Sequence, residues 1–185
     1  MANVFIIHGA YGSPKENWYP WLKTELDKCG CRVFVPEFPT PENQNLENWL
    51  KAFEPYRQYV DKNSIVVGHS IGVSFLLTII ESLSKPIRAA FFVSGFVSLL
   101  NNQSFDGINR SFVEKEFNWS LIKQNCNKFY IIHSDDDPYV SLEKARELSN
   151  RLGVPPFIMR YAGHFNEGSG YTKFDLLLQK IKNEL

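Results

Sequence analysis

The segment Gly68-His69-Ser70-Ile71-Gly72 has the G-x-S-x-G spacing that holds a serine in a tight turn between a strand and a helix. A short β-branched apolar run at 65–67 precedes this segment, and an apolar run of helical length follows it at 73–82. The two glycines allow close approach of backbones, and the strained turn presents the serine hydroxyl above the end of the sheet. The pattern predicts that Ser70 is a nucleophile. The alternative is a strand-to-helix turn that happens to hold a serine.

A serine hydroxyl needs a general base, and the base needs an orienting carboxylate. In enzymes built around such a turn, the chain order is serine, then acid, then histidine. The chain has four histidines, and only His164 follows every candidate acid. Because His164 lies in a loop after the last predicted strand, we predict that it is the base. The alternative is an ordinary surface histidine.

Three adjacent carboxylates follow the fifth predicted strand, at positions 135–137. Side chains alternate at a strand end, so they cannot all face one site. Asp137 precedes Pro138, which restricts it to an extended backbone and stiffens the turn. We therefore predict Asp137 as the acid, ahead of Asp136 and Asp135, with a solvated acidic turn as the alternative. The segment lacks the glycine and distal glutamate of a calcium loop, so we expect no metal.

An acyl-transfer site also needs two backbone N–H groups to hold the oxyanion. We predict that one belongs to Ile71, directly after the nucleophile, and that the other comes from the loop after the first strand. Ala10 is the preferred donor there, since Gly9 allows close approach of the backbone. We expect the remaining histidines, at positions 8, 69 and 133, to be structural.

Apolar strands alternate with amphipathic helices along the chain, which predicts a three-layer α/β domain over residues 1–185 with a parallel sheet of about six strands. The predicted strands are 4–7, 32–35, 65–67, 87–93, 129–132 and 156–161. The predicted helices are 18–29, 46–60 with an interruption at Pro55, 73–84, 119–124, 143–152 and 171–185. Ligands of such sheets bind beyond the carboxyl ends of the strands, and the four histidine-bearing loops lie at those ends.

The longest predicted irregular segment is 94–118, which is rich in phenylalanine. We expect this segment to line an apolar acyl pocket together with Tyr11, Trp18 and Phe165. The chain leaves no room for a large cap domain, which favours a small or short-chain substrate over a long lipid.

Composition excludes several classes of function. Charged residues make up 22% of the 185 residues and the formal net charge is zero, so nothing indicates a nucleic-acid or membrane-surface partner. The apolar stretch at 4–7 is too short for a signal peptide or a membrane span. The three cysteines are too few for a disulfide framework, and no second pair completes a zinc site. We therefore expect free thiols and a cytoplasmic protein.

These residues together resemble the α/β-hydrolases, and more narrowly the small cap-less serine hydrolases of the retinoblastoma-binding protein 9 and YdeN family. The resemblance covers nearly the whole chain. It rests on the segments at 6–9, 18–22, 66–72, 136–138 and 163–165. It implies a triad of Ser70, Asp137 and His164 and no cofactor. The pocket-protein partner in the family's name is not expected, because no L-x-C-x-E segment is present.

The sequence thus predicts a serine hydrolase that cleaves a small ester, or an amide, through an acyl-enzyme. Two other functions stay open. One is a non-catalytic protein-binding module on the same scaffold, since fold does not fix function. The other is an enzyme of another class, such as a lyase or a dehalogenase, although a dehalogenase normally needs a carboxylate where Ser70 stands.

Overall fold

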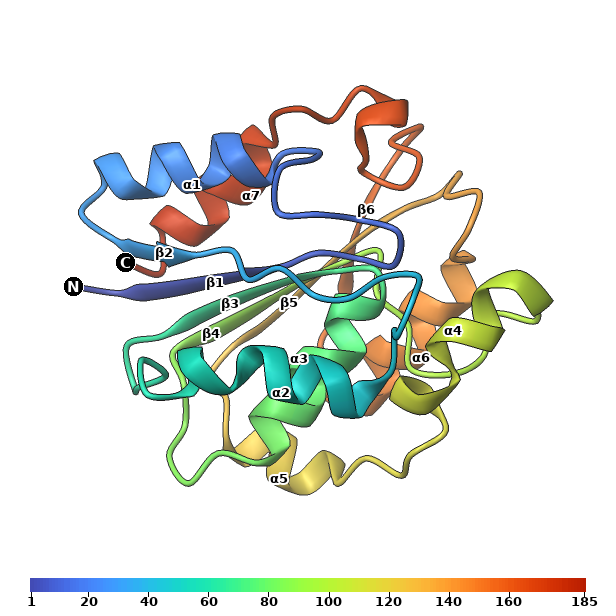
Figure 1. The fold of residues 1–185 in the computed structure, drawn as a ribbon. Coiled ribbons are helices and arrows are strands. Elements are labelled where there is room, and N and C mark those ends of the chain that lie inside the picture. Colours follow the sequence, from blue (N-terminus) through green and yellow to red (C-terminus); the bar gives the residue numbers. More distant parts are fainter.

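Six strands form one open, fully parallel sheet in the computed structural model, which describes residues 1–185 (Figure 1). Their order across the sheet is β2-β1-β3-β4-β5-β6. The strands are β1 (Asn3–Ile7), β2 (Arg32–Phe34), β3 (Ile65–His69), β4 (Ala89–Val93), β5 (Phe129–Ser134) and β6 (Pro156–Met159). The chain first moves outward from β1 to β2 and then returns to place β3 on the other side of β1. The carboxyl ends of β1 and β3 therefore flank the reversal of strand order, where ligands of such sheets bind.

Helices cover both faces of the sheet. Figure 1 shows α1 and α7 on one face and the remaining α-helices on the other. The helices are α1 (Tyr19–Lys28), α2 (Leu46–Arg57), α3 (Ile71–Glu81), α4 (Gln103–Val113), α5 (Trp119–Gln124), α6 (Leu142–Leu152), the 3-10 turn η1 (Glu167–Ser169) and α7 (Asp175–Lys182). This three-layer arrangement without a large cap confirms the fold class predicted from the sequence.

Two apolar cores flank the sheet, one on each face, and β3 contributes alternate residues to both. Val66 packs into the core on the α3 side, whereas Ile65 and Val67 pack into the core on the α1 and α7 side. All five residues of β3 are buried, which explains why its first three residues are apolar without alternation. The elbow between β3 and α3 is thus fixed from below by both cores.

The segment predicted to be irregular contains α4, so this part of the prediction was wrong. Asn102 caps the helix by accepting a hydrogen bond from the Ser104 amide. Phe105, Asn109 and Phe112 recur at helical spacing and face inward, a period that the surrounding polar residues obscured.

The predicted interruption of the second helix was also wrong. Residues Leu46–Arg57 form one helix with Pro55 inside it. Pro55 lies in the last turn, so the lost hydrogen bond and the clash of its ring with the preceding turn disturb only the end of the helix.

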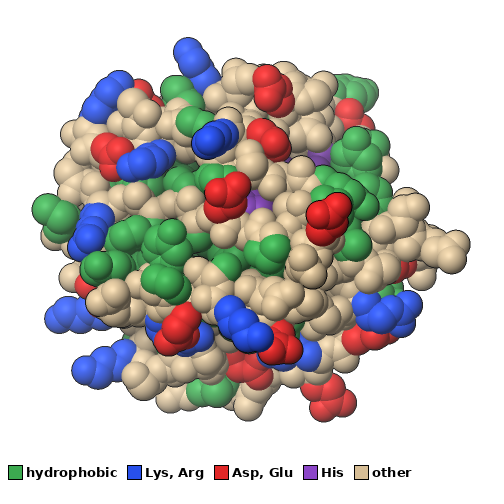
Figure 2. All heavy atoms as spheres, viewed as in Figure 1, with side chains coloured by type: hydrophobic (Ala, Val, Ile, Leu, Met, Phe, Trp, Pro, Cys, Tyr) green, Lys and Arg blue, Asp and Glu red, His purple; other side chains and the backbone are tan.

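Charged side chains of both signs are scattered over the face shown in Figure 2, in keeping with the zero formal net charge. None of the helices combines the length and the apolar character that a bilayer-crossing segment needs.

Candidate active site

Ser70 occupies the turn between β3 and α3 in a strained backbone conformation, with φ 56° and ψ −125°. The amide of Ser70 donates to the carbonyl of Val93 at 2.9 Å, which ties the turn to β4. A Cβ at Gly72 would lie 2.7 Å from the carbonyl oxygens of Ile7 and His8. Because those atoms belong to the backbone of β1 and its loop, only glycine fits, and the half-buried Ser70 is held beside the end of β1.

Asp137 and His164 form a buried pair at the ends of β5 and β6. The Nδ1 atom of His164 lies 2.8 Å and 3.0 Å from the two carboxylate oxygens of Asp137. The amides of Tyr139 and Val140 also donate to Asp137, each at 3.0 Å. Burial alone would raise the pKa of Asp137, but the hydrogen bond from His164 and these amides outweigh it and lower the pKa.

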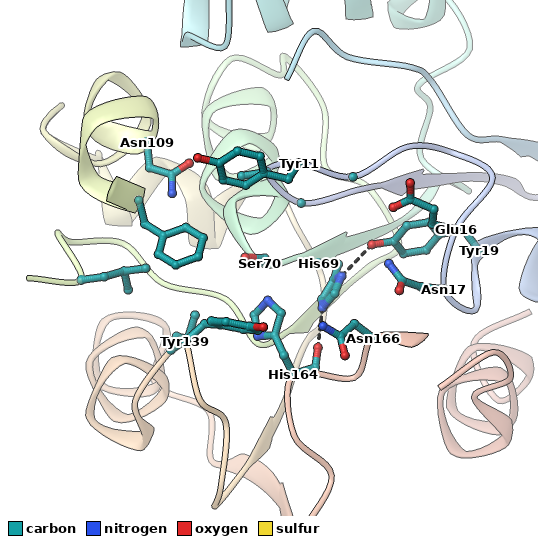
Figure 3. A pocket seen from close by; sticks show the side chains of 16 residues that line it. Tyr11, Glu16, Asn17, Tyr19, His69, Ser70, Asn109, Tyr139, His164 and Asn166 are labelled. Carbon is teal, nitrogen blue, oxygen red and sulfur yellow. Dashed lines mark hydrogen bonds between the residues drawn. The ribbon is translucent and has the colours of Figure 1, made fainter. Parts of the chain in front are cut away.

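A carboxylate only accepts hydrogen bonds, so Nδ1 of His164 carries the proton that is shared with Asp137. The lone pair of a neutral imidazole then lies on Nε2. Figure 3 shows the ring of His164 directed toward Ser70, with both residues lining one cavity. A general base for Ser70 would need such a lone pair on the side of the serine hydroxyl.

The two neighbouring carboxylates have other partners. Asp136 accepts from the amide of Gly163 at 2.8 Å, and Asp135 accepts from the amide of Tyr161 at 2.9 Å. Both bonds fasten the loop that carries His164 to the end of β5. Asp137 therefore contacts the imidazole of His164, whereas Asp135 and Asp136 hold the backbone of the loop that carries this histidine (the histidine loop).

The loop after β1 runs close to the serine, and His8 sets its orientation. The Nδ1–H of His8 donates to the carbonyl of Gly9 at 2.8 Å, and its Nε2 accepts from the Phe38 amide at 3.1 Å. The Gly12 amide also donates to the Gly9 carbonyl, at 3.3 Å. In a trans peptide the following N–H points the opposite way, so the amide of Ala10 faces away from these partners.

Ile71 is the first residue of α3, where a backbone amide has no partner inside the helix. On the other side of the serine, a Cβ at Gly9 would lie only 3.0 Å from Cβ of Ser70. The structure therefore brings the loop of Ala10 and the start of α3 to the same serine, where two N–H groups could hold an oxyanion.

His69 connects α1, the elbow and the histidine loop, a role that the sequence did not reveal. Its Nε2 lies 2.7 Å from the carbonyl oxygen of His164, and its Nδ1 lies 2.6 Å from the hydroxyl of Tyr19 (Figure 3). Burial lowers the pKa of His69 to about 3, so the ring is neutral. Because a carbonyl only accepts, Nε2 carries the proton and Nδ1 accepts from Tyr19.

The cavity beside Ser70 has a volume of about 260 Å³ and two unlike walls. One wall is largely apolar and comes from the β1 loop, the segment before α4, α4 itself and the turn after β5. It is lined by Tyr11, Leu100, Phe105 and Tyr139, with Asn109 among them. The other wall is polar and is lined by Glu16, Asn17, Tyr19 and Asn166. No lysine or arginine lines the cavity, and no cluster of three or more His, Cys, Asp or Glu side chains is arranged to hold a metal ion.

Of the three predicted pocket residues, only Tyr11 lines the cavity. Trp18 and Phe165 are fully buried, and Nε1 of Trp18 donates to the carbonyl of Phe165 at 2.9 Å. Phe165 stacks on Phe174 with ring centroids 5.0 Å apart. These aromatic residues therefore support the histidine loop from the core. Their neighbours in sequence, Tyr19 and His164, line the cavity instead, although Tyr19 is itself fully buried.

The parallel sheet and its helices define an α/β-hydrolase fold, with the strained serine turn and the buried Asp-His pair at the strand ends. The family described as serine hydrolase matches residues 4–183. The chain therefore belongs to the serine hydrolase family, and the resemblance predicted from the sequence is confirmed.

Two curated relatives are similar over nearly the full chain. The hydrolase YdeN of Bacillus subtilis (strain 168) is 29% identical over 177 residues, which is 94% of this chain and 91% of YdeN. The serine hydrolase RBBP9 of Rattus norvegicus is 25% identical over 169 residues, which is 91% of this chain and 86% of RBBP9.

Solved structures agree with this assignment. The crystal structure of the ydeN gene product from B. subtilis superposes with a TM-score of 0.92 and 26% identity, covering 100% of this chain and 98% of that one. Est1E from Butyrivibrio proteoclasticus has the same fold, with a TM-score of 0.72 and 17% identity over 98% of this chain and 86% of its own.

Proposed function

We propose that this hydrolase cleaves a small ester, or an amide, through an acyl-enzyme formed on Ser70, with His164 as general base and Asp137 as its orienting acid. One observation carries the proposal: the strained serine and the buried Asp-His pair come from three separate segments, and Ser70 and His164 line the same cavity. A structural turn would need neither the strain at the serine nor a buried carboxylate behind the histidine.

In this mechanism Nε2 of His164 takes the proton of Ser70 as its oxygen attacks the substrate carbonyl. The carboxylate of Asp137 stabilises the imidazolium, while the amides of Ala10 and Ile71 hold the negative oxygen. His164 then gives its proton to the leaving group, and the acyl group remains on Ser70. Water, activated by the same histidine, releases the acid and restores the serine.

The two walls of the cavity differ in polarity, which supports placing the acyl chain of the substrate against one wall and its alcohol or amine against the other. The apolar wall of Tyr11, Phe105 and Tyr139 suits the acyl chain, because burying its carbon atoms there is favourable. The polar wall suits the alcohol or amine and the incoming water. At about 260 Å³ the cavity lies just below the usual range for drug-sized ligands, which favours a short acyl group.

The test is intact-mass spectrometry after incubation with a fluorophosphonate, on the wild type and on Ser70→Ala and His164→Ala. We expect one adduct on the wild type, none on Ser70→Ala, and at least a hundredfold slower labelling of His164→Ala, since general-base catalysis contributes about 10²–10⁴-fold. Circular dichroism spectra would show that the variants are folded. An unlabelled but folded wild type would overturn the hydrolase mechanism and leave the binding-module hypothesis.

A further inference from the structure

Helix α4 places one buried amide side chain, that of Asn109, in the apolar wall of the cavity. Asn109 is 2% exposed, lines the cavity and lies one helical turn after Phe105. A buried primary amide needs hydrogen-bond partners for its oxygen and for both N–H groups. The partners that the protein supplies show which of these groups is left for a ligand.

The oxygen of Asn109 already has a partner in Gln44, and the other contacts of Gln44 indicate the direction of that hydrogen bond. The backbone amide of Tyr11 can only donate, and it donates to the hydroxyl oxygen of Thr40 at 2.6 Å. The Thr40 hydroxyl in turn donates to the side-chain oxygen of Gln44. At its other end, the Gln44 amide lies 3.4 Å from the carbonyl oxygen of Ile108, which can only accept. That end is therefore the nitrogen, and it donates to Oδ1 of Asn109 at 2.7 Å.

With its oxygen bonded to Gln44, Asn109 has its side-chain nitrogen Nδ2 at the open end of this series of hydrogen bonds. The side-chain nitrogen has no acceptor in the protein, yet it is not sealed off from the cavity. In Figure 3 the nitrogen of Asn109 points into the space between the labelled residues. The cavity therefore presents a fixed, buried hydrogen-bond donor within a wall that is otherwise aromatic and aliphatic.

We propose that Asn109 forms a subsite for a neutral hydrogen-bond acceptor, a carbonyl or ether oxygen, carried by the acyl group of the substrate. This inference rests on the proposed function. A carboxylate is disfavoured as the acceptor because no lysine or arginine lines the cavity to compensate its charge. The rings of Tyr11 and Tyr139, each packed edge-on against Phe105, contact the acyl carbon atoms that precede the acceptor.

The acceptor belongs to the acyl group because Asn109 lies in the apolar wall, which the proposed function assigns to that group. A site built to donate a hydrogen bond loses more when the acceptor is missing than an apolar wall loses when a methylene is missing. Asn109 therefore makes the apolar wall selective for acyl groups that carry a hydrogen-bond acceptor. Plain alkanoyl esters would leave its buried N–H groups without a partner, whereas oxo-acyl esters would satisfy them.

The test compares 4-nitrophenyl esters that differ only in the acyl group: pentanoyl, 4-oxopentanoyl, hexanoyl, 5-oxohexanoyl, heptanoyl and 6-oxoheptanoyl. For each pair, kcat/KM of the oxo ester is divided by kcat/KM of its parent ester. This ratio is then divided by the ratio of the two rate constants for hydrolysis by hydroxide, which removes the electronic effect of the oxo group. We expect one spacing to be favoured about three- to tenfold in the wild type, the value of one net hydrogen bond.

Two variants and one control make the result specific. Asn109→Asp keeps the oxygen that accepts from Gln44 but replaces the free donor with an acceptor, so the oxo preference should disappear or invert. Asn109→Leu should also abolish it, whereas Ser104→Ala, on the exposed side of α4, should keep the wild-type ratio.

The outcomes separate this inference from the proposed function. A wild type that fluorophosphonate labels on Ser70 but that shows no oxo preference at any spacing would overturn the subsite alone. The same holds if Asn109→Asp keeps the preference of the wild type. A folded wild type that is neither labelled nor active on any of these esters would overturn the proposed function, and the subsite with it.

Discussion

Replacing Tyr19 with phenylalanine removes the hydroxyl that holds His69, and through it the backbone of the proposed general base. Tyr19 is fully buried, and its hydroxyl is the donor to Nδ1 of His69 at 2.6 Å. Without it the neutral ring has a buried acceptor with no partner. Moving the proton to Nδ1 would not help, because Nε2 would then face the carbonyl of His164 as a second acceptor.

The cost follows from this geometry. A buried polar atom left without a partner costs about 1–3 kcal/mol. For a chain of this length each kcal/mol lowers Tm by about 2–4 °C, so a central cost of about 2 kcal/mol lowers Tm by about 4–8 °C. If about 1–2 kcal/mol of this cost is transmitted to the position of His164, the rate at which fluorophosphonate labels Ser70 falls about 5- to 30-fold.

The assay combines differential scanning calorimetry with the rate of fluorophosphonate labelling. Tyr171→Phe is the matched control, because Tyr171 packs on Phe165 in the same region but its hydroxyl lies outside the His69 network. We expect the control to keep the wild-type Tm and labelling rate. If Tyr19→Phe also kept both, the hydrogen bond through His69 would have no part in stability or in positioning His164, and the reasoning would be refuted.

Three further predictions concern the triad, the elbow and the dependence on pH. Asp137→Asn should lower kcat by about 10³–10⁴-fold while the protein stays folded, measured with an activated ester; a loss below tenfold would exclude the proposed role of this carboxylate. Gly72→Ala should yield little folded protein, because its Cβ would lie 2.7 Å from backbone oxygens, whereas Gly107→Ala meets nothing within 4 Å and should raise the free energy of unfolding by about 0.5–1 kcal/mol in urea titrations. Burial holds the pKa of His69 at about 3, against about 6.5 in the unfolded chain, so the unfolded state binds the extra proton. Between pH 6.5 and about 3, the free energy of unfolding should therefore fall by about 1.4 kcal/mol for each pH unit on account of this group, and His69→Gln should lose less stability than the wild type over that range; parallel curves would contradict the assignment.

Local patterns predicted most of the elements and the serine turn. The glycine spacing around Ser70 indicates close backbone contacts, and the structure contains them. Where local signals conflict, the prediction failed: the polar residues around Phe105 hid the helical period of α4. Pro55 suggested a break that its place in the last helical turn makes unnecessary.

The substrate pocket was the least predictable part, because adjacent residues of one loop or helix face opposite ways. Trp18 and Phe165 look like ligand-contacting aromatics in the sequence, yet neither of them lines the cavity. Tyr19 is the neighbour that reaches the cavity. Nothing in the spacing of these residues distinguishes a core aromatic from a pocket aromatic, since that depends on which face of α1 packs on the sheet.

The sequence by itself determined the order of the elements, the serine elbow and the chain order of Ser70, Asp137 and His164, because these depend on local backbone preferences and hydrophobic periodicity. Only the tertiary structure decided which contacts those residues make. The bond from His69 to the histidine loop spans 95 positions of the sequence, and the bond from Gln44 to Asn109 spans 65. Such pairings follow from how the layers pack, which no local pattern encodes.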